Sequence, residues 1–474
     1  MVLYPILAVL TLFTNVLLAQ TGAERDNRAV YNKIEYFFNI QQVDSIYNLA
    51  SDSYRAKTTL TDMSQWLVHF VEFGRITEAN LVNYDQGIAN YDVKIGDKNA
   101  RIKLAIDSNY KYTLFQMGEI QGATVQVKEE PVILNVEQVD KFDHFVDSIA
   151  RTYIQQSHTQ SLAIGIIKGN EIKTSFYGET EKGNKTLPTA NTHYEIGALT
   201  QTFTAVLLAE LVENGTIQLE DSIVKFLPDS VAINPFVQKI TFKSLANHTS
   251  GLPQLPPHLK VKPADGSSPY VAFSREELFS FLKDCESEVE PEEQYSYSDL
   301  GFGLLGELIS IIVDKPFEEH LREIITQPLD MSSTAISLDK QQYMAPGHNR
   351  IGESLPTWEY NTLTGSQALK STIRDLLRYA RFQFEMPRTV LENAMARTRQ
   401  FSFFVPPNSD IGLAWHMNMV EDTVSYWMQG NTAGSSAFIG LVPDNRSAVV
   451  VLSNSAADVD EISKKILEKI ISPN

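Results

Sequence analysis

The sequence predicts an α+β protein made of two folded units that follow an N-terminal apolar segment. Its 474 residues exceed a typical single domain, and its 43% hydrophobic and 10% aromatic content supplies material for two cores. In two separate regions the spacing of apolar residues changes from helical to alternating. Two mixed units, each with its own helices and strands, therefore fit the chain better than one large domain.

The first 19 residues form the apolar segment. They contain no Asp or Glu, and Ala19 precedes the polar stretch QTGAERDNR. We expect a signal peptide at residues 1–19 and a secreted or periplasmic protein. The alternative is an uncleaved segment that anchors the chain in a membrane, although Pro5 interrupts a spanning helix there. No later run is comparably apolar, so we expect no membrane span after signal cleavage.

The net charge and the cysteine and histidine content limit which partners, disulfides and metals the chain can have. Lys and Arg total 40 against 58 Asp and Glu, so the net charge of −18 repels nucleic acid. The single cysteine, Cys285, excludes an internal disulfide, and no nearby cation marks it as a nucleophile. His348 and His416 lack metal-ligand spacing. We expect no metal and no cofactor, and the oligomeric state stays open.

Residues 25–115 are predicted to form the first unit. RAVYNKIEYFF and TDMSQWLVHFVEFG have helical spacing, and three alternating segments follow, separated by the turns GDKN and DSN. The alternating residues are Tyr91, Val93, Ile95, Ala100, Ile102, Leu104, Ile106, Tyr110, Tyr112 and Leu114. Helices followed by a meander resemble the small α+β cone fold of the ketosteroid-isomerase type. Such a cone either holds a small molecule or packs against a partner.

Residues 116–137 are interpreted as the end of the first sheet and a linker, and residues 138–474 as the second unit. The second unit begins with a helix, followed by the strands SLAIGIIK and EIKTSFYG around a Gly-Asn turn. The residues that share one face of this helix are Phe142, Phe145, Val146, Ile149 and Tyr153.

Five further segments carry a family resemblance. In chain order they are HYEIGALTQTFTAVLLAELVENG, ITFKSLANHTSGLP, YSYSDLGFGLLGELI, GSQALKSTIRDLLRYA and GNTAGSSAFIGLVPDNRSAVVVLSN. Together they resemble the serine β-lactamase and penicillin-binding-protein superfamily, in particular its class C and esterase-like branch. The resemblance implies an antiparallel sheet flanked by helices, with an all-helical subregion.

The resemblance also implies a three-part site, and each part is altered here. The family's S-x-x-K motif aligns with Ala198 to Gln201, so a methyl group replaces the nucleophilic hydroxyl and a carboxamide replaces the lysine. The tyrosine motif aligns with Tyr297 to Asp299, which keeps the phenol but replaces an amide with a carboxylate. No catalytic group is therefore expected intact at Ala198, Gln201, Tyr297, Asp299 or Asn431.

The third motif of the family, Lys or His followed by Thr or Ser and Gly, aligns with Asn431-Thr432-Ala433. We expect the backbone N–H groups of Ala198 and Gly434 to converge on one point at a helix N-terminus. The predicted cleft residues are Ala198, Gln201, Tyr297, Asp299, Asn431, Thr432 and Gly434. Because cations have been lost, neutral or cationic ligands should be preferred over penicillins.

Three functions stay open. The first is a non-catalytic protein that binds a small molecule or peptide in the cleft. The second is an active serine hydrolase of the esterase, β-lactamase or D-Ala-D-Ala peptidase type with another nucleophile, such as Thr200, Ser435 or Ser436. The third is an interaction protein whose cleft has decayed.

Other residues have simpler interpretations. Four further S-x-x-K strings begin at Ser108, Ser222, Ser280 and Ser337 and are expected to be ordinary surface pairs. His248 is interpreted as a turn residue, Trp415 and Trp427 as core residues, and Tyr297 either as a site residue or as a packed tyrosine. The acidic run that begins at Glu286 is interpreted as a solvated loop.

Overall fold

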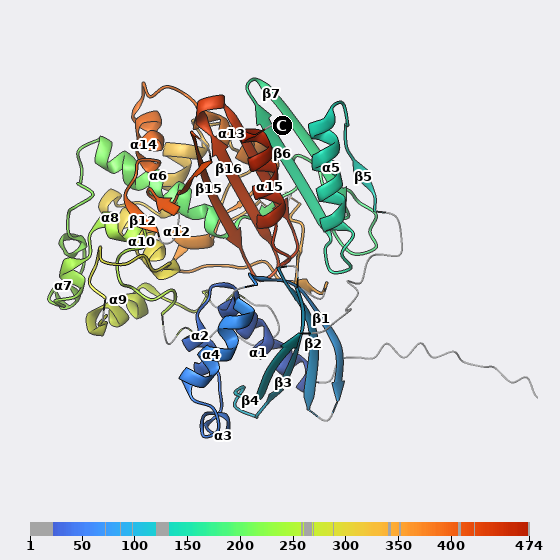
Figure 1. The fold of residues 1–474 in the computed structure, drawn as a ribbon. Helices are drawn as coiled ribbons and strands as arrows, with labels where there is room; N and C mark the ends of the chain where they lie inside the picture. Colours follow the sequence, from blue (N-terminus) through green and yellow to red (C-terminus); the bar gives the residue numbers. More distant parts are fainter. Residues whose placement is uncertain are drawn as a thin grey trace, which may run out of the picture. The chain divides into compact units, whose positions relative to one another are not determined.

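The structure is a computed structural model that divides into two compact units (Figure 1). It describes residues 22–472 except 72, 86, 97, 120–131, 257–258, 260–267, 269, 288, 340–342, 350–351, 406–408 and 421. One unit comprises Met1–Ile76 and Leu81–Glu119, and the other comprises Thr77–Asn80 and Ile120–Asn474. The predicted signal peptide lies outside the described residues. Among those that are described, no helix is both long and apolar enough to cross a bilayer.

The first unit combines helices with a four-stranded sheet. Its helices are α1 (Gly22–Asn39), α2 (Val43–Asn48), α3 (Asp52–Arg55) and α4 (Leu60–Val71). Its strands are β1 (Ile76–Asp85), β2 (Ile88–Ile95), β3 (Lys98–Ile106) and β4 (Tyr112–Glu119), in the order β1-β2-β3-β4. Tyr91 of β2 stacks on Tyr31 of α1 with 3.9 Å between ring centroids, which joins the sheet to the long helix.

The predicted α+β character of this unit is confirmed, although three of its elements were not predicted. The strand β1 and the short helices α2 and α3 were not predicted, because β1 buries residues without a regular alternation and each helix spans fewer than two turns. The sheet ends at Glu119, within the 116–137 segment where its end was predicted, and residues 120–131 of that segment lie outside the described part of the chain. The cone-type resemblance stays a prediction.

The second unit is built on a nine-stranded antiparallel sheet of order β12-β13-β14-β15-β16-β17-β6-β7-β5. The strands are β5 (Leu134–Asn135), β6 (Ser161–Lys168), β7 (Glu171–Gly178), β12 (Phe403–Val405), β13 (Ser409–Ile411), β14 (His416–Val420), β15 (Thr423–Asn431), β16 (Ser436–Val442) and β17 (Ser447–Ser453). The predicted hairpin is β6 and β7, paired from Lys168 and Glu171 outward. The predicted linker contributes β5 at the sheet edge.

Helices cover both faces of this sheet and form a separate helical region. The longer helices are α5 (Lys141–Ile154), α6 (Thr200–Glu213), α9 (Arg275–Asp284), α10 (Asp299–Val313), α13 (Ile373–Phe382), α14 (Val390–Thr398) and α15 (Asp460–Ile471). The short helices are η1 (Gly197–Leu199), η2 (Ile223–Phe226), α7 (Asp229–Ala232), η3 (Val237–Lys239), α8 (Phe242–Ala246), α11 (Phe317–Leu321), η4 (Arg322–Thr326), α12 (Thr364–Gln367) and η5 (Pro443–Asn445). Two-residue strands complete the unit: β8 (Tyr194–Glu195), β9 (Gly347–His348), β10 (Ser354–Leu355) and β11 (Lys370–Ser371).

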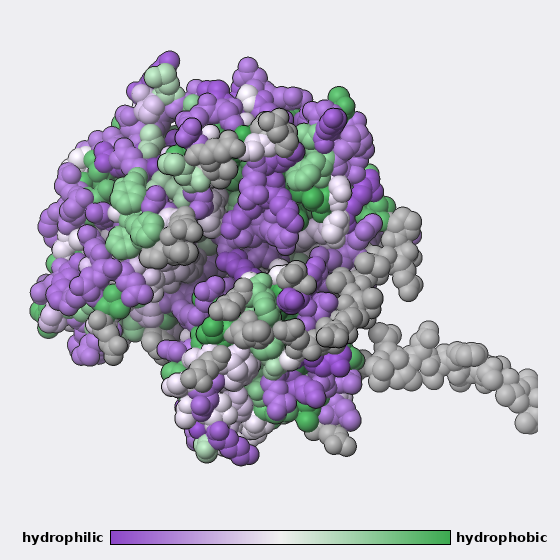
Figure 2. Space-filling model, in the orientation of Figure 1, coloured by the Kyte–Doolittle hydropathy of each residue, from purple (hydrophilic) through white to green (hydrophobic). Residues whose placement is uncertain are grey.

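The alternation of side chains along the central strands explains why helices lie on both faces. In β16, Phe438 and Val442 belong to the cluster that includes α5 and α15, whereas Ala437, Ile439 and Leu441 belong to the cluster that includes α6, α10 and α13. Successive residues of a strand point to opposite faces, so a strand that is apolar throughout needs cover on both. On the face shown in Figure 2, the exterior is mostly hydrophilic, with smaller apolar areas.

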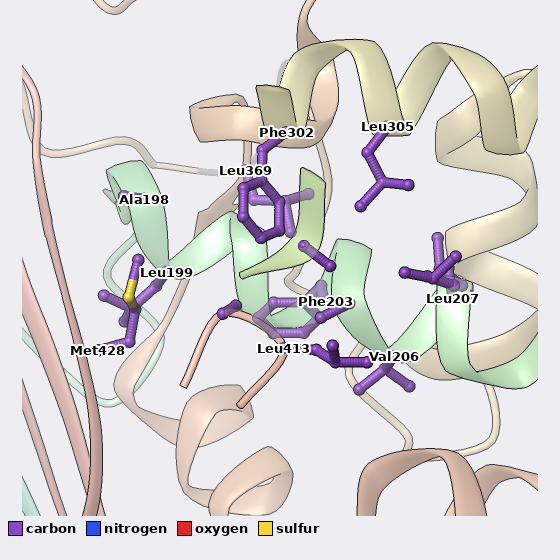
Figure 3. Packing of buried hydrophobic residues seen from close by; sticks show 14 of the residues in the cluster. Ala198, Leu199, Phe203, Val206, Leu207, Phe302, Leu305, Leu369, Leu413 and Met428 are labelled. Carbon is purple, nitrogen blue, oxygen red and sulfur yellow. The ribbon is translucent and has the colours of Figure 1, made fainter. Parts of the chain in front are cut away.

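The helix α6 is the centre of the larger cluster. All its residues from Thr200 to Leu211 are buried, the polar ones included, so the helix is enclosed on every side. Phe203 stacks on Tyr379 of α13 with centroids 4.2 Å apart, and Figure 3 shows Phe203, Val206 and Leu207 within the packed interior. This packing fixes the beginning of α6, where the candidate site lies.

Replacing Phe203 with alanine should remove this stack and leave a cavity beside Tyr379. Because large-to-small changes of a buried Phe cost about 3–5 kcal/mol, we expect a loss of that size in the free energy of unfolding, measured by urea titration. The matched control is Ile233→Ala, at a side chain that is 71% exposed, where the change should stay within about 0.5 kcal/mol. Equal effects of the two substitutions would contradict a central role for α6.

Candidate functional site

The site begins where two backbone segments touch at the start of α6. Gly197 has a φ of +51°, and a Cβ added to it would lie 2.9 Å from the backbone N of Asn431. A Cβ added to Gly430 would lie 2.7 Å from the backbone N of Ala198. Both positions therefore require glycine, one for its conformation and both for close approach. The end of β15 is thereby held against the turn that presents Ala198.

Gln201 lies one turn further along α6 and is fully buried. Its Nε2 donates to the Tyr297 hydroxyl at 2.7 Å and to Oδ1 of Asp299 at 3.1 Å. The Tyr297 hydroxyl in turn donates to the same Oδ1 at 2.8 Å. The structure thus brings three predicted site residues into one hydrogen-bonded cluster, only a few residues from Ala198.

His248 sets the orientation of the Gln201 amide. Its Nδ1 accepts from the backbone N–H of Ser298 at 3.0 Å, so the proton of the neutral ring is on Nε2, which donates to Oε1 of Gln201 at 3.1 Å. Burial, followed by the influence of His416, holds the pKa of His248 well below its usual range. The predicted turn position is correct, since φ is +59°, but the contact with Gln201 was missed.

Asp299 is the only ionisable acid in this cluster and begins α10. The N-cap Ser298 accepts from the N–H of Gly301, and the carboxylate of Asp299 is 1% exposed. Burial raises its pKa to about 6, against the opposing effects of Gln367, Tyr297 and Gln201. Its Oδ2 has no hydrogen bond within the described residues, although the Gln367 amide is close enough to lower the pKa of this carboxyl.

The third predicted motif lies differently from the prediction. Gly434 was expected beside Ala198, but its neighbours are Gly347 and His348, whose N–H donates to the Gly434 carbonyl at 2.9 Å. The backbone next to Ala198 is instead Gly430 and Asn431. The motif was therefore placed too far along the chain, in the turn that follows β15.

The side chains of that motif have partners of their own. Asn431 is exposed, and its Oδ1 accepts from the Ser436 hydroxyl at 2.7 Å. The Thr432 hydroxyl donates to Oε2 of Glu195 at 3.0 Å and accepts from the N–H groups of Gly434 and Ser435. The buried Glu195, whose pKa is raised by burial, was not singled out from the sequence.

The alternative nucleophiles lack an activating base in the described structure. The Thr200 hydroxyl is buried and accepts from the N–H of Leu369. The Ser435 hydroxyl is buried without a partner, and the Ser436 hydroxyl donates to Asn431. None of the three is hydrogen-bonded to a His, Lys, Asp or Glu side chain among these residues.

The S-x-x-K strings occupy ordinary positions. Ser108 is exposed in a turn, the Ser222 hydroxyl donates to the Gln238 carbonyl, and Ser280 is exposed on α9. The N–H of Ser337 donates to Glu318. None of these four serines adjoins the cluster around Gln201.

The remaining singled-out residues have structural roles. Trp415 is fully buried, whereas Trp427 is half-buried and stacks on His416 with centroids 4.6 Å apart. The Nδ1 of His348 donates to the Asn454 carbonyl. Burial raises the pKa of Cys285 to about 11, which makes its thiol a poor nucleophile.

Part of the acidic run is paired with lysines. Lys239 contacts Glu290 at 2.7 Å and Lys243 contacts Glu292 at 3.8 Å, both near the surface. The described residues contain no group of three or more His, Cys, Asp or Glu side chains arranged to hold a metal ion.

The second unit has the β-lactamase/transpeptidase-like α+β fold. Residues 146–470 match the family model described as Beta-lactamase, and the chain belongs to this family. The solved Beta-Lactamase/D-Alanine Carboxypeptidase from Pseudomonas syringae superposes with a TM-score of 0.62 at 22% identity, over 70% of this chain and 99% of that one. A class C beta-lactamase superposes with a TM-score of 0.62 at 20% identity, over 69% and 96%. The fold and family resemblance predicted from the motifs are confirmed.

Two curated relatives place the chain within the family. D-alanyl-D-alanine-carboxypeptidase/endopeptidase AmpH of Escherichia coli (strain K12) is 27% identical over 332 residues, which is 65% of this chain and 83% of that protein. A Beta-lactamase of Pseudomonas fluorescens is 24% identical over 346 residues, which is 65% of this chain and 92% of that protein. The chain is therefore related to both peptidases and β-lactamases of the family.

Replacing Asp299 with asparagine should change how stability depends on pH. The folded protein holds a proton on Asp299 more tightly than the unfolded chain, since burial raises the pKa from 3.8 to about 6. This group therefore contributes stability below about pH 4, and the contribution of about 3 kcal/mol is lost as pH rises through 6. Urea unfolding at pH 4 and pH 8 should show a loss that is about 3 kcal/mol smaller in Asp299→Asn than in the natural protein.

The control for this measurement is Asp422→Asn, at an exposed turn position, which should leave the pH profile as in the natural protein. A profile of Asp299→Asn that matches the natural one would contradict the burial effect.

Proposed function

We propose that this protein is a non-catalytic member of the Beta-lactamase family that acts by binding a small molecule or peptide. In this proposal Ala198 takes the place of the nucleophile and Gln201 that of the base. The observation that carries it is the hydrogen bonding of Gln201, whose amide donates to Tyr297 and Asp299 and accepts from His248. An amide nitrogen in these contacts has no basic lone pair, and a methyl group cannot be acylated.

The ordered polar cluster favours a retained site over a decayed one. A cleft without function loses its polar groups to apolar packing, because buried polar groups without partners are costly. Here Gln201 and His248 are fully buried, and the amide and both ring nitrogens have partners. This order argues against an interaction protein whose cleft has simply decayed.

The alternative of an active hydrolase with a different nucleophile has less support. Thr200, Ser435 and Ser436 lack a contact with any acid or base side chain among the described residues. Activation of a hydroxyl requires such a partner or a lowered pKa. The esterase, β-lactamase and peptidase activities of the family are therefore assigned to its relatives and not to this chain.

Three aspects of the proposal rest on sequence alone. The apolar residues 1–19 support secretion or a periplasmic location, with a membrane anchor if the segment is not cleaved. The negative net charge supports a partner other than nucleic acid. The first unit is proposed as a second binding module.

Intact-protein mass spectrometry tests the loss of acyl transfer. The natural chain is incubated with a penicillin, an activated ester and a fluorophosphonate, and we expect no adduct. A stoichiometric adduct would overturn the proposal, and its peptide map would identify the nucleophile.

Restored variants show where the loss lies. Ala198→Ser with Gln201→Lys returns both groups, and Ala198→Ser alone is the matched control. Because the introduced lysine would adjoin the Asp299 carboxylate and stay protonated, a third variant also carries Asp299→Asn. We expect labelling in the order triple, double, single, and labelling of the single variant alone would contradict a role for Gln201.

Penicillin binding tests the preferred ligand charge. No Lys or Arg nitrogen lies within 4 Å of Asp299 among the described residues, so an anionic ligand meets a carboxylate without a compensating cation. Calorimetry at pH 7.5 should detect no binding tighter than about 1 mM. A tighter complex would contradict the expected preference for neutral or cationic ligands.

A further inference from the structure

Asp299 lacks the ion pair that four other buried carboxylates of the second unit have, a property it shares with Glu195 and Glu210 among the described residues. Asp143, Asp147, Glu307 and Asp375 each have a Lys or Arg nitrogen within 4 Å. No ion pair to Asp299 exists within the described residues, although its side chain is as buried as theirs. A buried carboxylate without a cation is costly, so a proton or a bound cation has to compensate its charge.

The hydrogen bonds around Asp299 leave one oxygen open. Oδ1 accepts from both Gln201 and Tyr297, whereas Oδ2 accepts from no described residue. Of the four side chains in the network, only Tyr297 is partly exposed, and His248, Gln201 and Asp299 are buried. Tyr297 is therefore the member of this network that solvent contacts.

Two tyrosines lie near enough to this carboxylate to feel its charge. Burial and the negative charge of Asp299 raise the pKa of both Tyr270 and Tyr295, which places these phenols within its field. Tyr270 stacks on Tyr360 with centroids 4.6 Å apart and meets Trp358 at 5.4 Å. The faces of Tyr and Trp rings attract cations, and a carboxylate near tyrosines is suited to an ammonium group.

We infer that Asp299 and the nearby tyrosines bind the ammonium group of a small amine. This inference rests on the proposed binding function and names the ligand class for the same cleft. The ammonium donates to Oδ2, the oxygen without a partner, and supplies the missing positive charge. The neutral network from His248 through Gln201 keeps Oδ1 occupied, so it orients the carboxylate toward the ligand.

The bond to an amine depends on the ionisation of Asp299. The groups that face it are Tyr270, Tyr295, Tyr297, Gln201 and Gln367, and beyond Gln201 the neutral His248. Neither amide titrates, and burial keeps Tyr270 and Tyr295 protonated at neutral pH. Asp299 is therefore the group in this set that changes charge between pH 5 and pH 8, around its pKa of about 6.

The experiment compares three probes that differ in charge and share one ring: benzylamine, benzyl alcohol and benzoate. Calorimetry at pH 7.5 on the full chain should show benzylamine binding at least about ten-fold more tightly than benzyl alcohol, and no binding of benzoate. At pH 5 the affinity for benzylamine should fall about ten-fold, since about a tenth of Asp299 is then ionised.

Asp299→Asn should abolish the difference between amine and alcohol. The matched control, Glu210→Gln, neutralises another buried acid whose pKa is raised by burial and should keep the difference. If Asp299→Asn fails to fold, the pH profile of the natural protein decides. Equal affinities for amine and alcohol at pH 7.5, or an unchanged difference in Asp299→Asn, would overturn the inference.

The two proposals fail in distinguishable ways. Adduct formation with the fluorophosphonate would contradict the proposal that the protein is non-catalytic. The calorimetric data would still decide whether Asp299 binds amines. Absence of amine binding without any adduct would overturn the ligand class alone.

Discussion

The close contact between the end of β15 and the turn before α6 is the constraint on which the site depends. Gly430 and Gly197 let the two backbones meet where any side chain would collide with Ala198 or Asn431. This contact fixes the first turn of α6. Because the rest of the helix is buried and cannot shift, Gln201 is held within hydrogen-bond distance of Asp299 on α10. A larger residue at position 430 would move both segments apart and separate Gln201 from Tyr297 and Asp299.

The hydrogen bonds of the site form a chain from Ser298 through His248 and Gln201 to Tyr297 and Asp299. The Ser298 N–H fixes the tautomer of His248, and His248 fixes the Gln201 amide, so its two N–H donors point toward Tyr297 and Asp299. Each group after Ser298 accepts a hydrogen bond from the group before it and donates one to the group after it, and the last group, Asp299, only accepts. The network therefore requires an acceptor at position 299, and the Oδ1 of Asp299 supplies it.

The sequence predicted which residues of the first two motifs come together, but it placed the third motif at the wrong position along the chain. The spacing from Ala198 to Gln201 is one helical turn, and Tyr297 and Asp299 flank a helix start, so these four residues could be grouped from motif order. The third motif could not be placed in this way, because several small residues follow β15 and only packing against the turn at Gly197 distinguishes Gly430 from Gly434. The role of His248 depends on a backbone N–H fifty residues away, which no local pattern reveals.

Two differences from the family motifs act together: position 201 lacks the positive charge of a lysine, and position 299 carries a negative charge in place of an amide. A lysine at position 201 would lie within hydrogen-bond distance of the Asp299 carboxylate, and the buried pair would satisfy itself without a ligand. Glutamine donates at the same place without a charge, so the negative charge of Asp299 has no ion-pair partner within the described residues. One carboxylate then controls two properties, since the proton that stabilises the folded protein at low pH competes with any cation that binds at high pH. Stability and ligand affinity should accordingly change in opposite directions as pH falls through the pKa of Asp299.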